Sequence, residues 1–443
     1  MPDFAPSPPG DPLLGHLRPF RRDVLGLLLA AARDQGDVVR FRLGPLVVHL
    51  VNHPDHVAHV LQARARHYDK ATRSTAAIAA IAGTSLLTTN GPAWEARRRL
   101  MQPAFHRQRV GALADAMAAV TARRLDAWTP GATLDIASEM MRLAFEVAGA
   151  AILGADVSDV AGTLEDDIAL LLRHVYTRWG RLVPMPSWAP TPGNRRFDAA
   201  LARVDGLVMR LVRRYRERPD EAPPLLALLM SADDPDTGAP FTDSRLRDEV
   251  ITLLLAGHET TASALTWTFT FLSRHPDIET RVWAEVDDTL HGRMPGPGDV
   301  ASLRYTTQVL QEALRLAPPI WAIERRAVAA DTIGGFGIPA GSSVIVSPYV
   351  LHRHPAFWSD PERFDPGRFA AAKTPEAYLP FGAGPRYCIG AEFAMLEARL
   401  VLALVAQRWR LVPVPGQEVA PDAALTLRVR GGWRAVVQRR PRA

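Results

Sequence analysis

Apolar residues recur along most of the chain at three- and four-residue spacing, which is typical of amphipathic helices. This pattern extends from about residue 54 to 218, and it predicts further helices over 244–274, 302–316 and 391–409. The run "VLGLLLAAA" over 24–32 is far shorter than the roughly 20 residues needed to cross a bilayer. It therefore predicts a buried helix face and no membrane span.

Segments rich in β-branched residues indicate short strands. Residues 37–52 predict a hairpin in a small sheet near the N-terminus, 331–352 a second sheet, and 425–440 closing strands. Residues 353–387 form a long Pro- and Gly-rich segment with little periodicity, which is usually functional or tightly packed. Without repeats or flexible linkers, the pattern predicts one domain over 1–443, mainly α with small β-sheets (α+β).

Composition narrows the class of protein. The 443 residues are 47% hydrophobic, and 52 basic against 47 acidic residues give a net charge of +5. No run of like charge is present, so a nucleic-acid-binding arm is not expected. The proline-rich N-terminal segment lacks the order of a secretory signal, and the single cysteine, Cys388, excludes an internal disulfide. We expect a cytoplasmic protein.

The apolar stretch "LLLAGHETTASAL" contains an acid and two alcohols. His258 and Glu259 could begin a zinc helix, but that motif needs a second imidazole four residues later, where the chain has Ala262. A lone histidine and Cys388 do not supply four ligands. The zinc hypothesis is therefore not favoured.

The stretch "FGAGPRYCIG" places a thiol between a glycine-rich turn and a predicted helix start, whose N–H groups favour a thiolate. Gly384 and Gly390 let the backbone approach a flat or large object, and Arg386 can pair with an anionic group on it. A haem meets these demands, with iron for Cys388 and a broad face for Phe381. The alternative is that Cys388 is a small buried hydrophobe.

The pattern F-x-x-G-x-R-x-C-x-G over 381–390 resembles the cysteine-loop signature of the cytochrome P450 superfamily, soluble bacterial type, and the resemblance covers almost the whole chain. It implies a helix-rich triangular prism around a buried haem b (iron protoporphyrin IX) with Cys388 as the axial thiolate. It also implies a structural ion-pair network of Glu312, Arg315 and Arg363, from "EALR" and "PERF". Taken alone, Glu312 and Arg315 could be an exposed helix pair.

Basic residues elsewhere match positions that bind the haem propionates in this family. Trp94 and Arg98 stand in a W-x-x-x-R pattern, Arg325 follows the predicted helix over 302–316, and Lys70 adds a weaker match in "HYDK". Arginine suits this task because its fork binds carboxylates bidentately. Any one of these side chains could instead be a solvated surface group.

The stretch "AGHETT" resembles the oxygen-binding helix of the family. Ala256 and Thr260 are four residues apart and share a face, Gly257 leaves room for O2, and a Thr260 bond to a helix carbonyl would loosen the turn. Glu259 and Thr260 would pass protons to dioxygen as the catalytic pair. The alternative is a threonine that bonds its own helix carbonyl and a glutamate in an unrelated ion pair.

The resemblance also implies substrate and partners. The expected lining offers no obvious charged anchor, so the substrate should be a small hydrophobic compound, a terpenoid or other secondary metabolite; a fatty acid or polyketide is the alternative. Electrons should come from a separate ferredoxin and ferredoxin reductase, and we expect a monomer. A haem sensor or carrier, or a peroxide-driven or isomerising enzyme, would not need the acid and alcohol. The expected lining residues are Ile78, Ile81, Leu87, Leu253, Ile320, Ile323 and Leu427.

Overall fold

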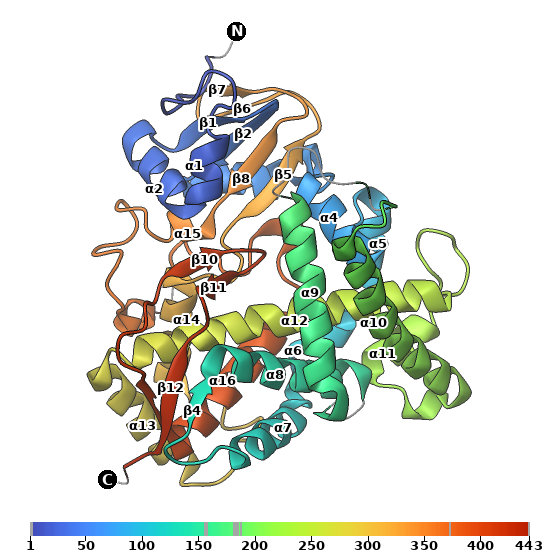
Figure 1. The fold of residues 1–443 in the computed structure, drawn as a ribbon, viewed down its shortest axis with the longest axis vertical. Helices are drawn as coiled ribbons and strands as arrows, with labels where there is room; N and C mark the ends of the chain where they lie inside the picture. The colour runs from blue at the N-terminus through green and yellow to red at the C-terminus, as the bar shows by residue number, and fades with distance from the viewer. Residues whose placement is uncertain (1–2, 155–157, 180–185, 187, 372–373, 442–443) are drawn as a thin grey trace.

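The computed structural model describes residues 3–154, 158–179, 186, 188–371 and 374–441. Helices make up most of the molecule, and a sheet lies beside the N-terminus (Figure 1). The predicted fold class, mainly α with small sheets, is confirmed. The helices are α1 Leu17–Arg22, α2 Val24–Gln35, α3 Pro54–Ala58, α4 Arg73–Ala82, α5 Gly91–Met101, α6 Arg107–Gly111, α7 Ala114–Asp126, α8 Ile136–Ala148, α9 Ser158–Trp179, α10 Pro192–Glu217, α11 Pro224–Met230, α12 Asp243–Leu272, α13 Pro276–Leu290, α14 Arg304–Leu316, α15 Pro348–Leu351 and α16 Ala391–Arg408.

Helix α12 crosses the middle of the molecule (Figure 1) and begins within one residue of its predicted start. Thr242 caps it, because its side chain accepts a hydrogen bond from the Arg245 amide. The C-terminal part from Ala262 to Leu272 is buried on nearly all sides, which is typical of a helix in the core of a large domain. The helices predicted over 302–316 and 391–409 are α14 and α16. None of the helices that the structure describes is long and apolar enough to span a bilayer.

The sheet near the N-terminus has five strands in the order β1-β2-β8-β5-β3. Its first two strands form the predicted antiparallel hairpin. The prediction of a separate second sheet over 331–352 is only partly right, because β8 pairs in parallel with β2 inside the first sheet. Three of the four residues of β8 are buried, which favours a central position covered on both faces. The strands of this sheet are β1 Val38–Leu43, β2 Leu46–Val51, β3 Tyr68–Asp69, β5 Ile323–Ala327 and β8 Ser343–Val346.

Three smaller sheets complete the structure. The remainder of 331–352 forms the hairpin of β6 and β7, and the predicted closing strands pair as β10 with β11 and as β12 with β4 and β9. The β10–β11 hairpin lies between the large sheet and α12 (Figure 1). The strands are β4 Thr133–Asp135, β6 Asp331–Ile333, β7 Phe336–Ile338, β9 Trp409–Pro413, β10 Pro421–Ala423, β11 Leu427–Val429 and β12 Arg434–Arg439.

A buried ion pair on α14 holds the long irregular segment. Arg315 donates from Nε and Nη2 to Glu312 at 2.7 and 2.8 Å, and neither side chain is exposed. The remaining guanidinium hydrogens reach the carbonyls of His352, Pro361 and Arg363 at 2.7–3.0 Å. The segment is therefore ordered by bonds to its backbone rather than by periodic packing of its own.

The prediction that the Arg363 side chain is the third member of this ion-pair network is wrong. Arg363 contributes only its carbonyl, and its side chain is exposed. The second arginine beside Glu312 is Arg368, whose Nε donates to Oε1 at 3.3 Å. Because both arginines stand in "PERFDPGRF", five residues apart, the sequence offered two candidates, and the backbone path decided between them.

Candidate active site

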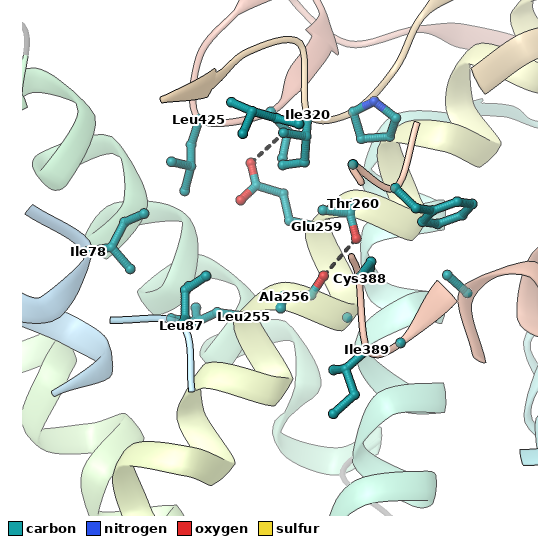
Figure 2. Close-up of a pocket in the computed structure, with 18 of the residues that line it drawn as sticks. Ile78, Leu87, Leu255, Ala256, Glu259, Thr260, Ile320, Cys388, Ile389 and Leu425 are labelled. Atoms are coloured by element: carbon teal, nitrogen blue, oxygen red, sulfur yellow. Dashed lines mark hydrogen bonds between the residues drawn. The ribbon is translucent and has the colours of Figure 1, made fainter. Parts of the chain in front are cut away.

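A cavity of about 510 Å³ lies between α12, the cysteine loop, α4, α5, α9 and the β10–β11 hairpin. Its walls are mostly apolar. In the view of Figure 2, Ile78, Leu87 and Leu425 lie to one side of α12, and Cys388 and Ile389 lie to the other. Elements distant in sequence therefore meet around a single space large enough for a bound organic group.

The cysteine loop is shaped by its own backbone. A 3₁₀ turn over Gly384–Arg386 precedes the thiol, and the Cys388 amide donates to the Phe381 carbonyl at 3.0 Å. Gly384 has φ +69°, and a Cβ there would lie 1.9 Å from the Leu61 carbonyl oxygen. The glycine is thus required by the neighbouring π-helical turn His59–Ala63, not by a flat ligand as the sequence suggested. Around Gly390, by contrast, a Cβ would meet none of the described atoms within 4 Å.

Cys388 lies in the wall of the cavity, and its sulfur is accessible from that space. Burial raises the pKa of the thiol, while a backbone hydrogen bond from Gly390 and the charge of Arg98 act in the opposite direction. The helix start by itself therefore does not give the thiolate that we expected. A bound metal cation would give it, because a coordinating thiol loses its proton outright.

Four cations surround the same cavity: Lys70, Arg98, Arg325 and Arg386. Lys70 Nζ donates to the Leu87 carbonyl at 2.8 Å, and Arg325 Nη1 to its neighbour's carbonyl at 3.0 Å. Arg386 Nη2 donates to a backbone carbonyl at 2.8 Å and to an asparagine amide oxygen at 3.0 Å. Among the described residues, none of the four has a carboxylate ion-pair partner.

Burial without a counter-charge lowers the pKa of these groups. It lowers the pKa of Arg325 to about 10 and that of Arg386 to about 10, where the charge of Arg325 adds to the effect. The pKa of Lys70 falls well below its usual range through burial and the charges of Arg325 and Arg386. A buried cluster of this kind needs anionic groups, so it fits a ligand that carries carboxylates beside Cys388.

Trp94 packs against Arg386, one of the four cations. The Arg386 guanidinium carbon lies 4.1 Å from the centre of the indole ring, and Trp94 is buried. A cation over an indole face is a favourable arrangement. Trp94 also lines the cavity with Arg98, one turn further along α5.

The predicted oxygen-binding residues of α12 face this cavity too. Ala256, Gly257, Glu259 and Thr260 all line it. Thr260 Oγ1 donates to the Ala256 carbonyl at 2.7 Å, as drawn in Figure 2. The helix nevertheless continues as α-helix through this turn, so the bond does not break the α-helical pattern. A Cβ on Gly257 would meet none of the described atoms within 4 Å, which leaves open space at that position.

Glu259 has partners that sequence reasoning missed. Its Oε1 accepts hydrogen bonds from Thr426 Oγ1 at 2.8 Å and from Arg428 Nε at 2.9 Å, and Arg428 Nη2 also donates to it. Arg428 lies in the segment "ALTLRV", directly after Leu427, which was expected to line the pocket. The arginine in that segment was the available signal. Arg428 itself does not line the cavity, but the carboxylates of Glu259 and Glu324 do, so the lining carries charge that the expected absence of an obvious charged anchor did not foresee.

His258, the residue before Glu259, packs inside the protein and does not line the cavity. His258 is buried, packs edge-on against Phe145 at 5.8 Å, and lies 3.3 Å from the Leu254 carbonyl through Nδ1. Among the described residues, no group of three or more His, Cys, Asp or Glu side chains is placed to hold a metal ion. The described chain therefore does not offer a metal in this cavity a set of three or more such side chains.

Five of the expected substrate contacts line the cavity: Ile78, Leu87, Leu253, Ile320 and Ile323. Two expectations were wrong. Ile81 is 1% exposed and packs in a core cluster, about one turn of α4 beyond Ile78, which is only partly buried. Leu427 is 0% exposed and points into the main core from β11. Ser74, Leu86, Tyr176, Glu324 and Leu425 also line the cavity, from segments near the expected residues, although they were not named from the sequence. Sequence reasoning missed Phe105 and Ala264.

The comparisons with known proteins agree with this geometry. The cytochrome P450 family model matches residues 6–429. Cyclooctatin synthase of Streptomyces melanosporofaciens is 39% identical over 427 residues, 95% of this chain and 93% of that protein. Cyclooctat-9-en-7-ol 5-monooxygenase of the same organism is 38% identical over 417 residues, 93% of this chain and 90% of that protein.

A solved structure has the same fold over the whole length of the match. The crystal structure of the cytochrome P450DA heme domain superimposes with a TM-score of 0.89 at 28% identity, and the match covers 100% of this chain and 99% of that one. The fold, the match to the family model and the cavity that contains one cysteine among unpaired cations lead to the same conclusion. The chain belongs to the cytochrome P450 family and is a haem-iron monooxygenase.

Proposed function

We propose that the protein binds haem b through Cys388 and hydroxylates a terpenoid at an unactivated C–H bond, using O2. The observation that carries this proposal is the joint placement of one thiol and four cations without carboxylate partners in one apolar cavity. Lys70, Arg98, Arg325 and Arg386 would hold the two propionates, and Phe381 would contact the porphyrin. The chain's own groups thus match the charges and shape of a haem.

When bound, the haem supplies the iron at which O2 is reduced and activated. The chain has to admit O2 and deliver protons to it. Gly257 leaves open space on α12, and Thr260 presents a hydroxyl to the cavity while it donates to the Ala256 carbonyl. Glu259 would supply protons through ordered water to this hydroxyl, so that reduction of O2 is coupled to hydroxylation rather than to release of peroxide.

The substrate class follows from the cavity walls and the relatives. The walls beside α12 carry Ile78, Leu87, Leu253, Ile320 and Leu425, which favour a compact hydrocarbon skeleton over an ionic compound. The relative named cyclooctat-9-en-7-ol 5-monooxygenase acts, by its name, on an unsaturated alcohol, and both this enzyme and cyclooctatin synthase are terpenoid-modifying enzymes. We therefore favour a cyclic terpenoid over a fatty acid or polyketide.

The single cysteine of these 443 residues cannot hold an iron–sulfur cluster, so no such cluster within them supplies the electrons. We propose a ferredoxin, reduced by a ferredoxin reductase, as the donor to a monomeric enzyme. Purification followed by light scattering, and turnover with the ferredoxin and its reductase, test these two points.

The central experiment uses the haem-loaded protein. The reduced wild type should give the carbon monoxide spectrum of a thiolate-ligated haem, and Cys388→Ser should lose it while still folding. Spectral titration with cyclooctat-9-en-7-ol, other cyclic terpenoids, fatty acids and macrolides then identifies the substrate class. A protein that stays colourless after haem supplementation contradicts the proposed cofactor, and a shift with fatty acids alone contradicts the proposed substrate.

A further inference from the structure

The two oxygens of the Glu259 carboxylate differ in their hydrogen bonds. Every hydrogen bond to the side chain ends on Oε1, from Thr426 and from two nitrogens of Arg428. Oε2 has no hydrogen-bond partner among the described residues, and Glu259 lines the cavity. Figure 2 likewise draws a bond to one carboxylate oxygen only. Oε2 is thus available to exchange a proton with water in the cavity.

Arg428 is not needed to attach its own hairpin to the protein. The Leu427 carbonyl already accepts hydrogen bonds from Ser263 Oγ at 2.5 Å and Trp267 Nε1 at 2.9 Å, both on α12. Trp321 Nε1 donates to another carbonyl of the hairpin segment at 2.9 Å. Since these bonds fix the β10–β11 hairpin independently, the ion pair with Glu259 is available for a different task.

The ion pair also connects the buried helix to the outside. The side chain of Glu259 is 2% exposed, whereas that of Arg428 is 27% exposed. A guanidinium stays protonated in proteins, so Arg428 cannot carry the proton itself. What it can do is fix the orientation of the carboxylate with two donors in a rigid fork.

We propose that Arg428 is a positioning residue for proton delivery, which holds Glu259 through Oε1 and keeps Oε2 turned to the cavity. In each cycle Oε2 would take a proton from water and release it toward O2, returning to the carboxylate. One oxygen atom of O2 enters the substrate, and the other leaves as water with two protons and the two electrons from the redox partner. This inference rests on the proposed function.

The test compares three haem-loaded variants with the wild type. Arg428→Leu removes the charge, Arg428→Lys keeps the charge without the fork, and Arg430→Leu is the matched control. Arg430 lies on the same hairpin, but its side chain is exposed and donates only to the Pro421 carbonyl. The probe is whichever cyclic terpenoid gives the largest spectral shift with the wild type, with cyclooctat-9-en-7-ol tried first.

We expect Arg428→Leu to fold and to bind the probe within about twofold of the wild type, but to have a lower melting temperature, because the buried carboxylate of Glu259 loses its ion-pair partner. Its kcat for hydroxylation should fall by at least about tenfold, with a larger share of the electrons from the redox partner recovered as peroxide and a larger solvent deuterium isotope effect. Arg428→Lys should recover part of the loss, and Arg430→Leu should match the wild type. Infrared spectra of the resting protein should show a changed carboxylate band in Arg428→Leu only.

Two results would overturn the inference. One is coupling in Arg428→Leu equal to that in Arg430→Leu, and the other is a loss confined to probe binding, which would make Arg428 part of the pocket wall. If Arg428→Leu does not fold, Thr426→Val removes the third donor to Oε1 and should shift coupling in the same direction by a smaller amount. A wild type that shows no hydroxylation at all contradicts the proposed function instead.

Discussion

Two arginines of one short segment have different roles although they are five residues apart. Arg368 lies beside the buried Glu312, with a side chain only 12% exposed, whereas the Arg363 side chain is exposed. Glu312 Oε1 also accepts from Arg315 Nη2 and from the Asp365 amide. Because the carboxylate is fully buried, each donor that it loses costs desolvation energy that water cannot repay.

We predict that Arg368→Ala lowers the free energy of unfolding by about 1–3 kcal/mol, the usual cost of losing a hydrogen bond to a buried charged group. The control, Arg363→Ala, keeps the carbonyl that Arg315 contacts and should stay within about 0.5 kcal/mol of the wild type. Urea unfolding of both variants measures the difference. Equal effects would contradict the assignment of Arg368.

At the scale of elements, the cysteine loop is positioned by the π-helical turn His59–Ala63, which is more than three hundred residues earlier in the chain. The Leu61 carbonyl occupies the place that a side chain on residue 384 would need. The two elements therefore pack backbone against backbone. Any side chain at this position must displace either the turn or the loop that carries Cys388.

Gly384→Ala tests this packing, and Gly416→Ala is its control. Gly416 has φ +78°, close to the +69° of Gly384, but a Cβ there would meet none of the described atoms within 4 Å. The control should cost about 1–2 kcal/mol from backbone strain alone. Gly384→Ala should cost clearly more in thermal unfolding and should lower the fraction of protein that binds haem. Equal losses of stability in the two variants would mean that backbone strain, and not the contact with Leu61, causes the loss in Gly384→Ala.

At the scale of the whole molecule, the cation cluster is assembled from segments far apart in the chain. Lys70 follows β3, Arg98 lies on α5, Arg325 on β5 and Arg386 in the cysteine loop. Folding brings these charges into a cavity where none of them has a carboxylate ion-pair partner among the described residues. A bound anionic cofactor removes this repulsion, so haem binding and folding stability are linked.

This linkage predicts a pH dependence. In the haem-free protein the lowered pKa of Lys70 means that the unfolded chain binds more protons than the folded one at pH values between that lowered pKa and the usual 10.5. The free energy of unfolding should therefore rise with pH, by at most about 1.4 kcal/mol per pH unit. Haem propionates, or Lys70→Met, should flatten this slope in urea unfolding at pH 7, 8 and 9. If Lys70→Met leaves the slope unchanged, another titrating group causes the pH dependence of the free energy of unfolding.

Local patterns in the sequence determined the elements and the chemistry. Helical periodicity placed α12, α14 and α16 within a few residues, since burying an apolar stripe depends on near neighbours in the chain. Short motifs likewise located Cys388, Thr260 and Glu259, because their spacing reflects a single loop or helical turn. The hairpin of β1 and β2 is equally local.

Only the tertiary structure decided which distant groups meet. It placed β8 beside β2, chose Arg368 over Arg363, and paired Glu259 with Arg428. It also placed the side chains of Ile81 and Leu427 in the core. Each of these outcomes depends on the path of the backbone between segments and on which face of an element is covered, and neither is encoded in the spacing of nearby residues.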